Sequence, residues 1–140
     1  MSLALRTLQG TPSSEVTLED LRWIHLHKTA ALLNLSITAG GIVAGADDKQ
    51  IEKLESYSDS IGLAFQVADD ILDCTADSAK LGKTAGKDEA TDKATYVRML
   101  GLDGAKAEAG RLRDLAVDCV EGEEGEALRC FADFIVRRDH

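Results

Sequence analysis

The stretch IGLAFQVADDILDCT, residues 61–75, decides the fold class, because its apolar residues recur at helical intervals. The residues that lie three or four apart, as on one face of an α-helix, are Ile61, Phe65, Ala68 and Leu72. The same rhythm runs back to Ile51. We therefore predict one long helix that begins with Asp47 or Asp48 as its N-cap and ends at about Cys74.

Four polar side chains of this stretch share one stripe of the predicted helix. Because each residue advances about 100°, Asp70, Asp73 and Asp69 fall at about 40°, −20° and −60° from Gln66. Carboxylates one turn apart repel each other at a cost of about a few tenths of a kcal/mol. A bound divalent cation would offset this repulsion, and a site made only of oxygen ligands suits Mg²⁺.

The alternative is that the acids form a solvated helix face without a ligand. Two features favour a cation site. The stripe lies at the predicted C-terminal end of the helix, where the helix dipole disfavours negative charge. A segment with four lysines, residues 75–94, follows at once, as a phosphate site requires. We predict this segment to be a long polar loop, because it has no apolar periodicity.

Gly82, Lys83 and Thr84 are similar to the end of a phosphate-binding P-loop. That motif requires a glycine five residues before Gly82, where this chain has Asp77, and a preceding strand, where we predict a helix. The sequence therefore excludes a nucleotide site of this kind. Lys83 and, with less support, Lys87 either contact phosphate as point charges or lie free in solvent.

A second predicted helix runs from the capping-box pair Thr17 and Asp20 to about Ala46. Its predicted core-facing positions are Leu21, Ile24, Lys28, Ala31, Leu35, Thr38 and Ile42. A lysine at such a position is costly without an anionic partner. Lys28 therefore points to a carboxylate or anion across the bundle, or else its chain extends along an apolar surface to solvent.

The other segments complete an all-α prediction. Few runs alternate apolar and polar residues, so strands are not expected. The further predicted helices are residues 96–100, ended by Gly101, residues 103–120 and residues 127–137. We interpret residues 1–16 as a polar lead-in or artificial start and residues 17–140 as one helical domain.

The composition excludes several classes of protein. The chain has 140 residues and a formal net charge of −9, which makes it a poor partner for nucleic acid or an anionic membrane surface. Its longest apolar stretch, residues 37–46, is about half of what a membrane span requires. Three cysteines without C-x-x-C spacing indicate reduced thiols in a cytoplasmic protein. His25 and His27 point about 200° apart on a helix and cannot share a zinc ion.

Four stretches, in order, resemble the C-terminal half of the trans-isoprenyl diphosphate synthases, the polyprenyl synthetase family that includes farnesyl and geranylgeranyl diphosphate synthases. They are IHLHKTAALL (24–33), IGLAFQVADDILDCT (61–75), LGKTAGKD (81–88) and KATYVRMLG (93–101). The ending FADFIVRRDH (131–140) is similar to that of the short-chain bacterial members. The resemblance covers about residues 17–140 and implies part of the all-α bundle of isoprenoid synthases.

The resemblance implies a prenyltransferase of isoprenoid biosynthesis. An allylic diphosphate ionises, the double bond of isopentenyl diphosphate attacks the allylic cation, and a proton is lost. Pyrophosphate leaves only when its charge is neutralised, so such a site requires Mg²⁺ and cationic side chains. By this resemblance Asp69 and Asp73 would hold Mg²⁺, directly or through water, with Asp70 in support.

The same resemblance implies roles for four further residues. Lys28 and Lys83 would contact the allylic diphosphate. Thr29 and Gln66 would direct their oxygen dipoles at the developing cation.

This chain departs from the family in length. A full synthase is roughly twice as long, and the first of its two aspartate-rich motifs belongs to the N-terminal half, whereas no second D-D-x-x-D occurs here. We therefore interpret the chain as the C-terminal half of a synthase, with little or no prenyl transfer by itself. The alternative is a non-catalytic, synthase-derived helical subunit that pairs with or modulates another synthase chain. An incomplete bundle also exposes apolar surface, so a homodimer or other self-association is expected.

Overall fold

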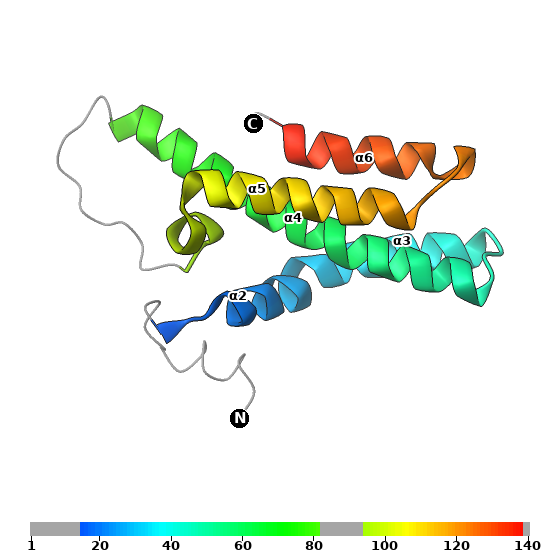
Figure 1. Cartoon of the computed structure of the whole chain (residues 1–140). Helices are drawn as coiled ribbons and strands as arrows, with labels where there is room; N and C mark the ends of the chain where they lie inside the picture. Colours follow the sequence, from blue (N-terminus) through cyan, green and yellow to red (C-terminus); the bar gives the residue numbers. More distant parts are fainter. Residues whose placement is uncertain (1–14, 82–93, 139–140) are drawn as a thin grey trace.

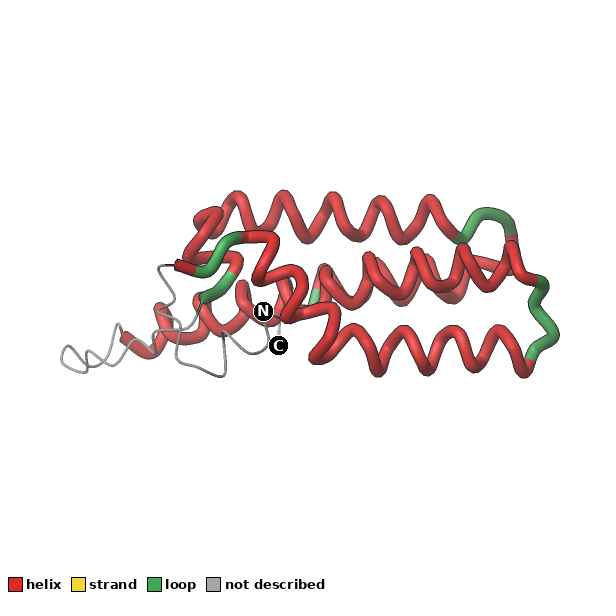
Figure 2. Tube along the Cα trace, turned by 90° about the horizontal axis from the view of Figure 1, so that it is seen from below, coloured by secondary structure: helices red, strands yellow, loops and turns green. Residues whose placement is uncertain are grey.

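The structure, a computed structural model, describes residues 15–81 and 94–138. Within these two ranges it is built of helices and contains no strand (Figure 2), which confirms the all-α prediction. The elements in chain order are α2 (Leu18–His25), η2 (Leu26–Ala30), α3 (Ala31–Val43), α4 (Asp48–Leu81), α5 (Tyr96–Cys119), η3 (Glu123–Gly125) and α6 (Glu126–Arg137). Element η2 is a π-helix and η3 is a 3₁₀-helix.

Helix α4 is the centre of the bundle. It contacts α2, η2, α3, α5 and α6, and Figure 1 shows α5 and α6 along one side of it with α2 on the other. Tyr57, Ile61 and Val67 on α4 are fully buried. The Tyr57 hydroxyl donates a hydrogen bond to the Leu128 carbonyl over 2.7 Å and so joins α4 to α6. Burial raises the pKa of Tyr57 to about 12, so this hydroxyl keeps its proton.

The prediction for α4 is confirmed at its start and wrong at its end. The Asp47 side chain accepts from the Gln50 N–H, and the Gln50 side chain accepts from the Asp47 N–H, each over 2.9 Å. Asp47 is therefore the N-cap. The helix then continues past Cys74 to Leu81, because residues 75–81 contain neither glycine nor proline.

This longer helix corrects two further expectations. Residues 75–81 are helical and not part of a loop, whereas residues 82–93 lie outside the described residues. The acidic stripe also lies about two turns before the end of α4. The helix dipole acts only within the last turn, so it no longer disfavours these carboxylates.

The segment predicted as one helix from Thr17 to Ala46 is divided by η2. The capping box is confirmed, since the Thr17 hydroxyl accepts from the Asp20 N–H over 3.1 Å and the Asp20 carboxylate accepts from the Thr17 N–H over 3.0 Å. A π-turn contains one residue more than an α-turn. The buried face therefore passes from Leu21 to His25 and then, after five residues, to Ala30.

The extra residue overturns most of the predicted core-facing stripe. Leu21 is buried as predicted, but Lys28, Ala31, Leu35 and Ile42 are exposed. Lys28 therefore does not lie in the core, and its ammonium group reaches solvent. The expectation failed because the 3.6-residue period was carried through a π-turn that shifts the register by one residue.

Small residues decide which face of α3 meets α4. A Cβ atom on Gly62 would overlap with the Cβ of Ala30 and lie 2.9 Å from its Cα. A Cβ on Gly41 would likewise overlap with Leu54. At Gly62 the backbones of α4 and η2 approach each other closely, and at Gly41 the Leu54 side chain of α4 lies against the backbone of α3, as glycine permits. Gly41 thus lets the Leu54 side chain approach α3, while Leu32, Leu35 and Ile42 lie on the outer face of that helix.

The C-terminal helices follow the predicted pattern. Gly101 has φ 72° and ψ 168°, and this non-helical residue breaks α5 where the short helix 96–100 was predicted to end. Helix α6 begins one residue before the predicted position and ends at Arg137 as predicted.

We predict that Gly62→Ala destabilises the chain by about 1–3 kcal/mol, because the added methyl group must separate α4 from Ala30. The matched control is Gly110→Ala in α5, where an added Cβ meets no atom within 4 Å. This control is expected to stabilise the helix by up to about 1 kcal/mol. Urea denaturation measures both free energies of unfolding, and equal changes would contradict the close packing of α4 on η2.

Candidate functional site

The acidic stripe of α4 presents its three carboxylates to three different surroundings. Asp73 is exposed, and the side chain of Asp69 is 42% exposed and forms an ion pair with Arg138. Asp70 is buried, with 6% of its surface exposed. Gln66, which precedes them on the same stripe, is partly buried. The three aspartates of the predicted stripe therefore differ in exposure: Asp69 and Asp73 reach solvent, whereas Asp70 does not.

Among the described residues, Arg138 forms an ion pair with the stripe, through Asp69. Its guanidinium group donates to the Asp69 carboxylate and, over 3.2 Å, to the Phe65 carbonyl. It also stacks over the Phe65 ring, with 4.0 Å to the ring centroid. Sequence reasoning placed two arginines near the end of the last helix but could not connect them with Asp69, since 69 residues separate the partners.

Asp70 points into the junction between α4 and α5. Its carboxylate accepts a hydrogen bond from the backbone N–H of Tyr96, the first residue of α5, over 2.8 Å. Tyr96 is itself fully buried, and burial raises its pKa to about 12, with smaller contributions from nearby charges including Arg22 and Glu108. A carboxylate held in this way has one oxygen committed to the protein backbone.

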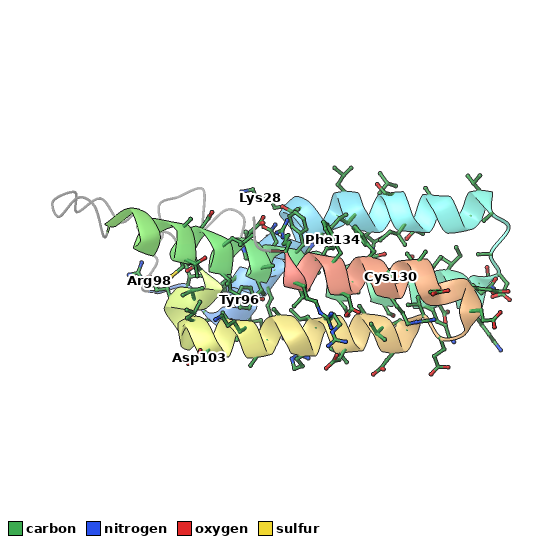
Figure 3. The ribbon with its side chains drawn as sticks, turned by 90° about the horizontal axis from the view of Figure 1, so that it is seen from above. Lys28, Tyr96, Arg98, Asp103, Cys130 and Phe134 are labelled. Atoms are coloured by element: carbon green, nitrogen blue, oxygen red, sulfur yellow. The ribbon has the colours of Figure 1, made fainter. Side chains whose placement is uncertain are left out.

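The second predicted constellation, His25 to Thr29, lies at the start of and within the π-helix η2. His25 is buried, whereas His27 and Lys28 are exposed and Thr29 is partly buried (Figure 3 labels Lys28). His27 stacks on Trp23 at a centroid distance of 4.0 Å, and its Nδ1 lies 2.8 Å from the Trp23 carbonyl oxygen. The two histidines thus point to different surroundings, as predicted. Single π-turns frequently occur at functional sites.

The packing of α4 on η2 brings the two constellations onto adjacent elements. Ala30, directly after Thr29, contacts Gly62, which lies one turn before Gln66 on α4. The segment with Lys28 and Thr29 therefore lies beside the helix that carries the acids. Lys83, the remaining predicted site residue, lies outside the described residues.

The donor set fits a magnesium ion that is bound through few protein ligands. Asp69 and Asp73 are one turn apart and both reach solvent. Mg²⁺ accepts one or two carboxylates and completes its shell with water and phosphate oxygens. No three His, Cys, Asp or Glu side chains converge on one point within residues 15–81 and 94–138. The roles of individual aspartates as metal ligands therefore remain predictions.

The outer face of α3 is an apolar surface. Leu32, Leu35, Ile42 and Val43 are each between 63% and 89% exposed. Leu35, Thr38 and Ile42 line a groove whose other wall includes Asp59 of α4. The Asn34 side chain donates to Asp59 over 3.0 Å across this groove. Leu35 and Ile42, which were predicted to face a core, thus belong to a face that the described part of the chain does not cover.

Two further expectations concern membrane spans and disulfide bonds. None of the helices that the structure describes is both long and apolar enough to cross a membrane. Within the described residues, no disulfide bond joins Cys74, Cys119 or Cys130 to another cysteine.

Comparison with known proteins identifies the family of this chain. The model of the Polyprenyl synthetase family matches residues 5–131. The chain is 47% identical over 136 residues to the chloroplastic geranylgeranyl pyrophosphate synthase of Capsicum annuum, covering 95% of this chain and 37% of that protein. It is 44% identical over 135 residues to the chloroplastic heterodimeric geranylgeranyl pyrophosphate synthase large subunit 1 of Arabidopsis thaliana, covering 94% of this chain and 36% of that protein.

A solved structure gives the same result. A protein from Marinomonas sp. MED121 that is assigned as a farnesyl-diphosphate synthase superposes with a TM-score of 0.74 at 34% identity, covering 96% of this chain and 45% of that one. The chain thus spans less than half the length of each of these relatives. The family model, the curated relatives and the fold agree with the resemblance found in the sequence, and the chain belongs to the polyprenyl synthetase family.

Proposed function

We propose that this chain supplies half of the active site of a Mg²⁺-dependent prenyltransferase that condenses an allylic diphosphate with isopentenyl diphosphate. The observation that carries the proposal is the pair of open carboxylates on α4, Asp69 and Asp73, beside the π-helix that holds Lys28. The chain spans less than half of its relatives. By itself it therefore transfers little or no prenyl group.

The chain's own residues have defined tasks in this proposal. Mg²⁺, when bound, neutralises the charge of the diphosphate so that pyrophosphate can leave. Asp69 and Asp73 hold that ion directly or through water. Lys28, with its exposed ammonium group, acts as a point charge on the diphosphate, and Lys83 is proposed to do the same. Thr29 and Gln66 direct oxygen dipoles at the carbon from which the diphosphate departs.

The second candidate function is a non-catalytic helical subunit that pairs with another synthase chain. The exposed apolar face of α3 favours it, and one relative is named as the large subunit of a heterodimeric synthase. The retained carboxylates favour the catalytic proposal, because a purely structural helix has no physical reason to place Asp69 and Asp73 together. Both functions require a partner surface.

We propose that, in the complete enzyme, further helices of the synthase bundle cover the outer face of α3. Phe134 on α6 is a further exposed apolar side chain, at 65% exposure. An apolar surface of this kind drives association when its partner is absent. The isolated chain is therefore proposed to self-associate through α3, as a homodimer or a larger species. The proposed location is the cytoplasm, and the three cysteines, which form no disulfide bond within the described residues, support it.

The proposed activity is tested on the complete enzyme. The intact mass of the protein is compared with the length of its reading frame. The full-length product, or this chain mixed with a complementary N-terminal half, is then assayed with Mg²⁺ and both diphosphates. Asp69→Asn is expected to lower kcat by about 10²–10³, the cost of removing one group that stabilises developing charge. The matched control is Asp103→Asn, which removes an exposed carboxylate on α5 and leaves the rate unchanged. Absence of prenyl transfer from the complete enzyme would favour the non-catalytic subunit.

The ion pair between Arg138 and Asp69 is expected to compete with the metal. Arg138→Gln frees the Asp69 carboxylate, so it should lower the Kd for Mn²⁺, a paramagnetic substitute for Mg²⁺, about threefold. A pair of this exposure is worth up to about 1 kcal/mol. The control is Arg137→Gln, which removes the same charge from an exposed position one residue away. Titration by electron paramagnetic resonance measures both values, and equal effects would show that only long-range charge matters.

Self-association is tested by static light scattering at tens of micromolar. We expect the unmodified chain to exceed the monomer mass and Leu35→Lys to approach it, since this change places a charge in the centre of the apolar face. Leu115→Lys introduces the same charge at a 44% exposed leucine of α5 and should not change the mass. A monomeric unmodified chain would rule out association through this face.

A further inference from the structure

The middle carboxylate of the sequence DDILD is the one that does not face solvent. Asp69 lies at 42% side-chain exposure and Asp73 is exposed, whereas Asp70 retains only 6%. Burying a carboxylate is costly unless hydrogen bonds replace its lost water. The position of Asp70 therefore demands a structural explanation that the positions of its two neighbours do not.

The explanation lies in the backbone of α5. The Asp70 carboxylate accepts from the Tyr96 N–H over 2.8 Å in a buried contact. The first N–H groups of a helix have no partner within the helix, and Tyr96 is the first residue of α5. A hydrogen bond from such a group to a carboxylate is charge-assisted and gains from the positive end of the helix dipole. Asp70 thus fastens the start of α5 to α4.

Tyr96 also contacts His25, in the segment that precedes Lys28. Its ring lies 5.6 Å from the ring of His25, with 40° between the planes. Both residues are buried, and His25 is directly followed by η2. Figure 3 shows Tyr96 inside the bundle, between the beginning of α5 and the neighbouring helices. Asp70, Tyr96 and His25 therefore link α4, α5 and α2 at the end of the bundle that holds both candidate half-sites.

We infer that Asp70 is a positioning residue and not a metal ligand: through Tyr96 and His25 it fixes the acidic face of α4 relative to the segment that carries Lys28 and Thr29. The metal of this motif is then held by Asp69 and Asp73 alone. The metal part of the inference rests on the proposed function, whereas the anchoring part rests on the contacts of Asp70 and Tyr96.

Two substitutions at Asp70 separate the two roles. Asp70→Asn keeps an oxygen that accepts from the Tyr96 N–H but removes the negative charge that a metal ligand requires. Asp70→Ala removes both. Tyr96→Phe is the matched control, because the buried Tyr96 hydroxyl makes no hydrogen bond within the described residues and the backbone N–H is retained. Asp69→Asn provides the reference for the loss of a metal ligand.

Three quantities are measured on the full 140-residue chain. The first is the hydrogen-exchange rate of the Tyr96 amide. The second is the Mn²⁺ affinity by electron paramagnetic resonance. The third is the broadening of the Thr29 amide signal by bound Mn²⁺. This broadening depends on the distance between the metal at the acidic face and the segment with Lys28 and Thr29. A change in stability alone does not alter that distance.

An anchoring role gives a defined pattern. Asp70→Ala speeds exchange at Tyr96 at least tenfold and alters the broadening at Thr29, while Asp70→Asn and Tyr96→Phe change the exchange less than about threefold, roughly what one retained hydrogen bond allows. Asp70→Asn keeps the Mn²⁺ affinity within about twofold, whereas Asp69→Asn weakens it by about tenfold, a loss typical of a metal-site residue.

Two results would overturn the inference. The first is a loss of Mn²⁺ affinity in Asp70→Asn as large as in Asp69→Asn, which would make Asp70 a ligand. The second is unchanged exchange at Tyr96 in Asp70→Ala, which would remove the anchor. If the alanine variant does not fold, the asparagine variant still decides the metal question. If the unmodified chain binds no Mn²⁺, the proposed function fails at this motif, while the exchange rates still decide whether Asp70 is the anchor.

Discussion

The contact between Gly62 and Ala30 is the constraint on which the arrangement of the candidate site depends. Neither residue has a side chain beyond Cβ, so the backbones of α4 and η2 come together without intervening atoms. Thr29 precedes this contact, and Gln66 follows it by one turn. The separation between the Lys28 segment and the acidic face of α4 is therefore set by the smallest pair of residues in the interface. A larger residue at position 62 would therefore increase that separation without altering any polar side chain of the site.

The acidic face shows how one sequence pattern divides into different physical tasks. Three aspartates on one stripe repel one another, and the fold reduces this repulsion in three ways. Water solvates Asp73, the guanidinium group of Arg138 pairs with Asp69, and the Tyr96 N–H bonds to Asp70. Each carboxylate of the face therefore has a polar or charged environment within the fold. A metal ion that binds to Asp69 must compete with an arginine that is already in place.

The outer surface of α3 is apolar and exposed in a chain that spans less than half the length of its relatives. A helix normally turns its largest apolar side chains toward the core, yet here Leu32, Leu35 and Ile42 face outward. Gly41 faces Leu54 of α4, and Ile37 is the larger α3 side chain that packs against the core. Helix α4 covers one face of α3, and under the proposed function another body covers the face that carries the exposed large side chains. The described part of the chain provides the first partner. The exposed groove beside Leu35 is the surface that the rest of a synthase would complete.

The sequence by itself determined the all-α class, the capping box at Thr17, an N-cap at Asp47 or Asp48, the break at Gly101 and the family, because these depend on residues close together in the chain. It also placed Asp69 and Asp73 on one helix face, since helical periodicity is local. Only the tertiary structure decided that Lys28 is exposed, because a π-turn with no sequence signal shifted the register. It alone paired Arg138 with Asp69 and Tyr96 with Asp70, since these partners lie 69 and 26 residues apart. Contacts of that range depend on how whole helices pack, which no local pattern contains.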